Sequence, residues 1–194
     1  MRGLMHDVVR DLAWTAANRW EPLGEAPPWR RVIICLGLLV KSRILGVFLI
    51  RAKLRLRTAH VPVLPAVCDR LAILVWNVNI GNYTRIGPGL YLPHGNVVID
   101  GLVSIGARCV IAPFVTIGVN GGLAGPTIGD DVFIGTGAKV LGGIRIGNGA
   151  RIGANAVVLE DVPERATAAG VPARIVRARD APSGGVTSEP ADGD

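Results

Sequence analysis

Hydrophobic positions recur every six residues from residue 80 onward. An aliphatic residue followed by Gly or Ala marks the steps, in nine pairs that begin at Ile80, Ile86, Ile105, Ile111, Ile117, Ile128, Ile134, Ile146 and Ile152. A helix cannot keep one face apolar at this period, because its turn takes about 3.6 residues. A coil of three short strands can, since each aliphatic side chain then points inward at one edge of a triangular prism. The pattern therefore predicts a mainly β solenoid of parallel strands with about 18 residues in each coil.

The six-residue rhythm is broken at two places. The step from Leu92 to Ile99 is seven residues and falls on the stretch LPHGN, which contains His94. The step from Ile117 to Ile128 is eleven residues, so GVNGGLAGPT is predicted to leave the prism as a loop. Irregularities of this kind in a solenoid often carry function.

The part before the repeats is predicted to be helical over residues 4–20, 30–57 and 66–77, with prolines between the helices. We expect these helices to pack at one end of the prism and to protect its open strand edge. The expected organisation is a helical segment over residues 1–78, a β-helix over 79–177 and a disordered tail over 178–194, which is rich in Pro, Gly, Ser and acids.

The net charge of +6 comes mostly from the N-terminal third of the chain. Arg51, Lys53, Arg55 and Arg57 alternate there with apolar residues. We interpret them as a solvated helix face, and peripheral contact with a membrane surface or an anionic substrate stays open as the alternative. Nucleic-acid binding is not expected, because the basic cluster has no aromatic interleaving.

The start of the chain does not resemble a secretory signal. The apolar stretch RVIICLGLLVKSRILGVFLIR is interrupted by Lys41 and Arg43, which disfavours a membrane span. No metal-ligand spacing is present among the cysteines, so we expect reduced thiols in a cytoplasmic protein; they are Cys35, Cys68 and Cys109.

Two stretches resemble the serine acetyltransferases and the polysaccharide O-acetyltransferases related to them. They are NIGNYTRIGPGLYLPHGNVVIDG and TIGDDVFIGTGAKVLGGIRIGNGARIGANAVVLEDVPERATAAGVPARIV, and the similarity covers residues 79–177. The resemblance implies a left-handed parallel β-helix and a homotrimer that uses acetyl-CoA as co-substrate. It also implies active sites in grooves between neighbouring prisms.

His94 falls on the catalytic histidine of that family. An imidazole that titrates near neutrality can accept the proton of an attacking hydroxyl and pass it to the departing thiolate. Asn79 stands where serine acetyltransferases have an aspartate that orients the ring, so the base should be weaker unless Asp100 or a partner subunit supplies a carboxylate. Pro93 replaces a second aspartate of those enzymes, which argues for a saccharide rather than serine as acceptor.

The resemblance also implies an acetyl-CoA site built largely from backbone groups. Glycines of the long loop would allow close approach to the thioester, two alanines one coil apart would follow the pantetheine arm, and two cations would meet the phosphates. The residues are Gly118, Gly121, Gly122, Ala138, Ala156, Lys139 and Arg174.

The expected function is therefore an acetyl-CoA-dependent O-acetyltransferase that modifies a saccharide or a polysaccharide precursor. Serine O-acetylation and a non-catalytic trimeric scaffold stay open as alternatives. A zinc enzyme of the γ-carbonic anhydrase type would need three histidines, whereas the repeats contain only His94. A nucleotidyltransferase would need a nucleotide-binding domain before the prism, and the first 78 residues do not resemble one.

Overall fold

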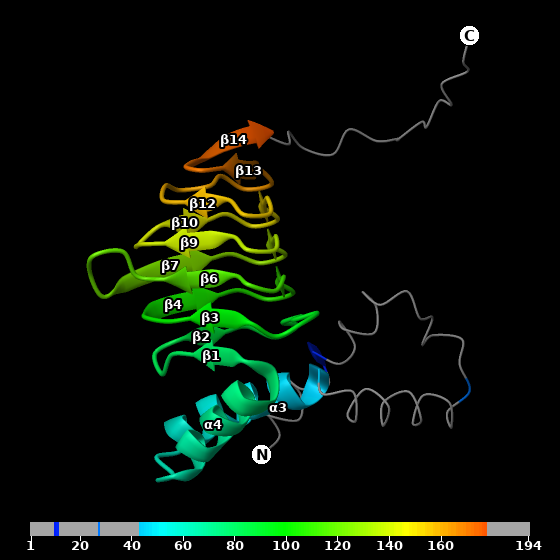
Figure 1. Cartoon of the computed structure of the whole chain (residues 1–194), viewed down its shortest axis with the longest axis vertical. Coiled ribbons are helices and arrows are strands. Elements are labelled where there is room, and N and C mark those ends of the chain that lie inside the picture. Colours follow the sequence, from blue (N-terminus) through cyan, green and yellow to red (C-terminus); the bar gives the residue numbers. More distant parts are fainter. Residues whose placement is uncertain (1–9, 12–26, 28–42, 178–194) are drawn as a thin grey trace.

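The computed structural model describes residues 10–11, 27 and 43–177 (Figure 1). Helix α3 (Arg43–Thr58) and helix α4 (Leu64–Trp76) precede the strands. The predicted helix over residues 4–20 and the first part of the one over 30–57 lie almost entirely outside the described residues. Helix α4 ends at Asn77, whose left-handed backbone (φ 52°) lets its N–H bond to the carbonyl of Ile73 at 2.8 Å. This turn feeds the chain directly into the first strand.

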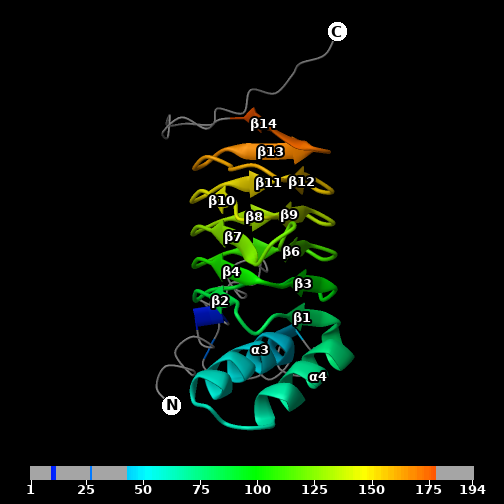
Figure 2. The same ribbon diagram turned by 90° about the vertical axis from the view of Figure 1, so that its left-hand side faces the viewer.

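Three stacked sheets of short strands form the walls of a prism (Figures 1 and 2). Sheet A contains β1 (Val78–Ile80), β3 (Val97–Ile99), β6 (Thr116–Gly118), β9 (Lys139–Leu141) and β12 (Val157–Val158). Sheet B contains β2 (Arg85–Ile86), β4 (Leu102–Ile105), β7 (Ala124–Ile128) and β10 (Arg145–Ile146). Sheet C contains β5 (Val110–Ile111), β8 (Phe133–Ile134), β11 (Arg151–Ile152), β13 (Thr167–Gly170) and β14 (Ala173–Arg177). The predicted parallel β-helix is confirmed.

The core is the column of side chains that the six-residue pattern points inward. Ile99, Ile117 and Ile134 are fully buried, and Val132 and Ala156 fill the narrower positions between them with no exposed surface. Ile86 is the exception among the nine repeat positions, because it is only partly buried beside the helices. Neighbouring coils pair in register, so each inward residue stacks on its equivalent one coil away.

Helices α3 and α4 lie across the β1 end of the prism (Figure 2). The Arg51 guanidinium donates to the carbonyl oxygens of Ile86 at 2.7 Å and Gly87 at 2.6 Å, and Lys53 donates to that of Ile80. These carbonyls belong to the first coil, which has no coil below it to supply donors. Both cations are 4% exposed and paired, Arg51 with Asp11 and Lys53 with Asp69.

This arrangement corrects our interpretation of the basic stretch. Arg51 and Lys53 face the prism rather than solvent, so they neither form a solvated helix face nor contact a membrane surface. Arg55 is exposed and Arg57 is half-buried. Within the described ranges, no helix combines the length and the apolar character that crossing a bilayer requires.

The opposite end of the prism closes in a different way. Strand β14 turns back and pairs antiparallel to β13, which ends the parallel stacking.

The loop predicted from the stretch GVNGGLAGPT is shorter than expected. Strand β7 already begins at Ala124, so only residues 119–123 leave the prism between β6 and β7. This loop projects sideways from the prism in Figure 1.

Candidate functional site

His94 is exposed on the turn that leads from sheet C to sheet A. The turn is held against the end of α4, because the N–H of Asn96 donates to the carbonyl of Trp76 at 3.2 Å and the Asn77 amide donates to Oδ1 of Asn96 at 2.7 Å. Gly95 packs so closely that a Cβ there would lie 1.7 Å from the Trp76 carbonyl oxygen. The imidazole is therefore carried by a short turn whose following residues, Gly95 and Asn96, are held against the end of α4.

Asn79 lies on the outward face of sheet A, near the turn that carries His94. It opens a row of paired outward positions that continues upward through the coils; these are Asn79, Val98, Thr116, Lys139 and Val157. The described residues include no hydrogen bond between His94 and Asn79. The position of Asn79 is compatible with its predicted role of orienting the imidazole, but the single chain does not form the hydrogen bond that this role requires.

Asp100 lies at the other edge of sheet A from His94. Its side chain follows β3, whereas His94 precedes β3, so a strand of about 10 Å separates them. The Asp100 N–H donates to the carbonyl of Ile117 at 2.9 Å, and a carboxylate oxygen lies 2.4 Å from where a Cβ on Gly81 would be. Within one chain Asp100 is therefore not placed to orient His94.

The glycines predicted to approach the thioester lie at the same edge as Asp100. Gly118 is the buried last residue of β6, and its carbonyl accepts the N–H of Gly142 at 2.8 Å. Gly121 and Gly122 are exposed, and a Cβ on either would meet no atom within 4 Å. Only Gly121, with φ 75°, has a backbone that requires glycine. The loop thus offers open backbone to a ligand or to another chain.

The predicted pantetheine positions, Ala138 and Ala156, are both fully buried. Their methyl groups fill the core, and their carbonyls already accept bonds from Thr116 at 3.0 Å and Lys139 at 2.8 Å. A carbonyl oxygen has a second lone pair, so each could accept one further bond from a ligand. Any role in binding would fall on these backbone oxygens, since the side chains are turned away.

The two cations predicted to meet phosphates are both accessible. Lys139 donates from Nζ to the carbonyl of Phe114 at 2.9 Å in an exposed setting. Arg174 lies 3.6 Å from a carboxylate oxygen of Glu160, and the two side chains are 64% and 76% exposed. Exposed contacts of this kind contribute little free energy, so either cation can turn toward an anionic ligand.

The predicted base and the predicted glycine loop lie at different edges of sheet A. His94 marks one edge of sheet A and Asn79 lies on the outward face of β1, whereas Asp100 and the loop over residues 119–123 mark the other edge. The width of the sheet keeps the imidazole away from the glycine loop of its own chain. A site that uses both groups needs a second chain.

Among the described residues, neither the Cys109 thiol nor a cluster of metal-ligating side chains offers an alternative centre. Burial raises the pKa of the Cys109 thiol to about 11, which makes it a poor nucleophile near neutral pH. The described part of the chain contains no cluster of three or more His, Cys, Asp or Glu residues that could hold a metal ion. Gly95, which the sequence analysis did not single out, is the residue whose lack of a side chain fixes the His94 turn.

Comparisons with known proteins agree with this fold. The family model described as bacterial transferase hexapeptide (six repeats) matches residues 125–160. The solved serine acetyltransferase of Neisseria gonorrhoeae in complex with serine is 31% identical, with a TM-score of 0.77, over 90% of this chain and 69% of that chain. The chain belongs to the serine acetyltransferase family.

Two further relatives define how far the similarity reaches. The serine acetyltransferase of Synechococcus elongatus is 41% identical over 130 residues, which is 62% of this chain and 53% of that protein. A solved serine acetyltransferase in complex with CoA is 29% identical, with a TM-score of 0.73, and the match covers 90% of this chain and 70% of that one. The chain thus spans about half the length of the Synechococcus relative.

The relatives bear directly on the predicted acceptor. All those named are serine acetyltransferases, so the comparisons fit the serine alternative better than the saccharide that Pro93 suggested.

Proposed function

We propose that the protein is an acetyl-CoA-dependent O-acetyltransferase whose acceptor is the hydroxyl of serine. The observation that carries the proposal is the exposed imidazole of His94 on a turn held against α4, and the resemblance aligns this residue with the family's catalytic histidine. Relatives solved with CoA and with serine support the two substrates.

The reaction follows from the chemistry of the imidazole. His94 accepts the proton of the acceptor hydroxyl while the oxygen attacks the thioester carbonyl carbon. The C–S bond then breaks, the acetyl group stays on the acceptor oxygen, and the CoA thiolate takes the proton from the imidazolium. A backbone N–H of the loop over residues 119–123 is suited to stabilise the oxyanion between these steps.

The proposed active unit contains more than one chain. His94 lies at one edge of sheet A and the glycine loop at the other, so the two meet when a neighbouring prism presents its opposite edge. The homotrimer implied by the resemblance would provide three such meeting points, with Lys139 and Arg174 as candidates for the CoA phosphates. Sedimentation should therefore find a trimer, and an active monomer would contradict this arrangement.

A saccharide hydroxyl is the second candidate acceptor. Pro93 occupies the position where the resemblance places the aspartate associated with gripping the amino acid, and proline has no carboxylate to pair with an ammonium group. A neutral acceptor makes no such demand.

The test is the release of CoA thiol from acetyl-CoA, measured with L-serine and with a panel of saccharides. His94→Ala should lower kcat by about 100-fold or more, since general base catalysis typically contributes that much. Arg70→Ala, an exposed change on α4, is the matched control and should retain wild-type kcat. Turnover only with saccharides would establish the second candidate. Equal inertness of wild type and His94→Ala toward every acceptor, without CoA binding, would leave the non-catalytic scaffold.

A further inference from the structure

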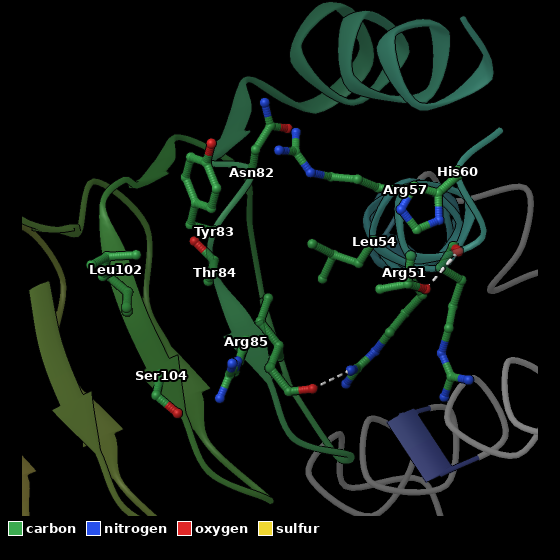
Figure 3. A pocket seen from close by; sticks show the side chains of 14 residues that line it. Arg51, Leu54, Arg57, His60, Asn82, Tyr83, Thr84, Arg85, Leu102 and Ser104 are labelled. Carbon is green, nitrogen blue, oxygen red and sulfur yellow. Dashed lines mark hydrogen bonds between the residues drawn. The ribbon is translucent and has the colours of Figure 1, made fainter. Parts of the chain in front are cut away.

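A cavity of about 860 Å³ lies between α3 and the first two strands of sheet B, β2 and β4. Figure 3 shows Leu54 and Arg57 entering it from the helix, and Tyr83, Thr84 and Arg85 entering from the first coil. Ser104 lines the sheet wall one coil further up. This volume is in the range of sites that hold a small molecule.

The charge of the cavity wall is entirely positive among the described residues that line it. Arg51, Arg55, Arg57 and Arg85 contribute guanidinium groups, and none of the described lining residues is acidic. The Arg51 group is already used by Asp11 and by two carbonyls of the first coil. Arg57 and Arg85 add further positive charge to the same wall.

Arg57 and Arg85 are the cations best placed to meet a ligand. The Arg57 guanidinium stacks over the Tyr83 ring, 5.1 Å from its centroid, which holds it at the cavity wall. Arg85 stands on the outward face of β2 and is exposed. Neither has an ion-pair partner in the part of the chain that the structure describes.

Thr84 is an independent observation that points to a polar ligand in this cavity. The residue lines the cavity, is only 4% exposed, and its Oγ1 has no hydrogen-bond partner among the described residues. Leaving a buried hydroxyl unpaired costs about 1 to 3 kcal/mol. A polar ligand atom that reached this hydroxyl would remove the cost.

We propose that this cavity binds a phosphorylated small molecule that also carries hydroxyl groups. Arg57 and Arg85 bind the phosphoryl oxygens, because guanidinium groups match phosphate geometry and charge. Thr84 and Ser104 hydrogen-bond the hydroxyl-bearing part, and the Tyr83 ring covers its apolar face. The site is separate from His94, which lies at a different edge of the prism, and from Lys139, which stands on sheet A.

Calorimetric titration of the full chain with glucose 1-phosphate tests the site, with glucose and inorganic phosphate as partial ligands. Wild type should bind glucose 1-phosphate more tightly than either partial ligand. The double variant Arg57→Gln and Arg85→Gln should weaken this binding by roughly tenfold or more, as expected for loss of charge-assisted hydrogen bonds. Arg145→Gln is the matched control, because Arg145 lies in the same outward row of sheet B two coils beyond the cavity.

Thr84→Val is a second variant that separates binding from folding. Removing an unpaired buried hydroxyl should leave the melting temperature unchanged or raise it, yet lower the affinity for glucose 1-phosphate. A purely structural role for Thr84 would not produce that combination.

Three results would overturn the proposal. One is no detectable binding of glucose 1-phosphate up to about 10 mM, tenfold weaker than a Kd of about 1 mM. Another is an equal loss of affinity in Arg145→Gln, which would show attraction to the general positive charge. The third is an equal loss of CoA binding in the double variant, which would make the cavity part of the CoA site. Glucose 1-phosphate binding can be measured whether or not the protein transfers acetyl groups.

Discussion

Gly95→Ala should lower kcat strongly while the protein stays folded, because the substitution displaces the turn that carries His94. The added methyl carbon would lie 1.7 Å from the Trp76 carbonyl oxygen and 2.9 Å from its carbon. Non-bonded heavy atoms settle at about 3.5 Å, so the turn must retreat from α4 by ~1.8 Å. The obstacle is backbone at the end of a helix, which cannot rotate away as a side chain would.

Such a shift should act on catalysis far more than on stability. Misplacing a catalytic group by about 1 Å can lower the rate about 100-fold, and overpacking typically costs about 1 to 3 kcal/mol of unfolding free energy. We therefore expect kcat for acetyl transfer to fall at least about 100-fold. The free energy of unfolding in urea should fall by no more than a few kcal/mol.

Gly147→Ala provides the matched control. Its added carbon would lie 2.4 Å from the backbone nitrogen of Glu164, so the packing conflict is similar, but it occurs near the β14 end of the prism. This variant should lose a similar amount of stability and keep most of its kcat. If Gly95→Ala kept kcat within about threefold of wild type, the turn would not be what positions His94, and the reasoning would fail.

Two further predictions concern groups outside the site. Cys109, buried and with its pKa raised to about 11, should resist thiol reagents at pH 8 until the protein unfolds, as followed by mass spectrometry; labelling of the native protein would contradict its burial. The Arg108 guanidinium lowers the pKa of Asp131, so the pair should stabilise the fold above the ordinary aspartate pKa of about 3.9 and lose that effect as pH falls through the lower, folded value. Both side chains are more than a third exposed, so the gap in unfolding free energy between wild type and Asp131→Asn should be below about 1 kcal/mol at pH 7 and vanish in acid; a gap that grew with falling pH would refute this.

The fold could be predicted because the repeat is a direct record of packing. Each inward position must be aliphatic to fill a narrow prism. The spacing of Ile117, Ile134 and their equivalents in the sequence therefore reveals the coil. The same rule explains why the interruption around His94 could be recognised without a structure.

What the sequence did not show depends on contacts between distant segments. We predicted Arg51 and Lys53 to be solvated, because the residues around them in the sequence do not indicate that the carbonyls of Ile80 and Ile86 need hydrogen-bond donors. The importance of Gly95 was also hidden, since glycine is common in every coil and only the approach of Trp76 distinguishes this one.

The six-residue repeat also did not show that the predicted site residues lie at two different edges of sheet A. His94 and Asp100 are six residues apart in sequence, yet β3 carries them to opposite sides of a sheet. Their short separation in sequence therefore suggested an interaction between the Asp100 carboxylate and the His94 imidazole that the prism prevents within one chain.

The two blocked ends of the prism also limit what the molecule can join. A solenoid with bare terminal strands would be a template for end-to-end growth, as in fibrils. Here buried cations occupy the carbonyls of the first coil, and a reversed strand ends the last one. Lengthening of such a molecule by duplication should therefore be accommodated in its middle coils, where every new turn finds partners above and below.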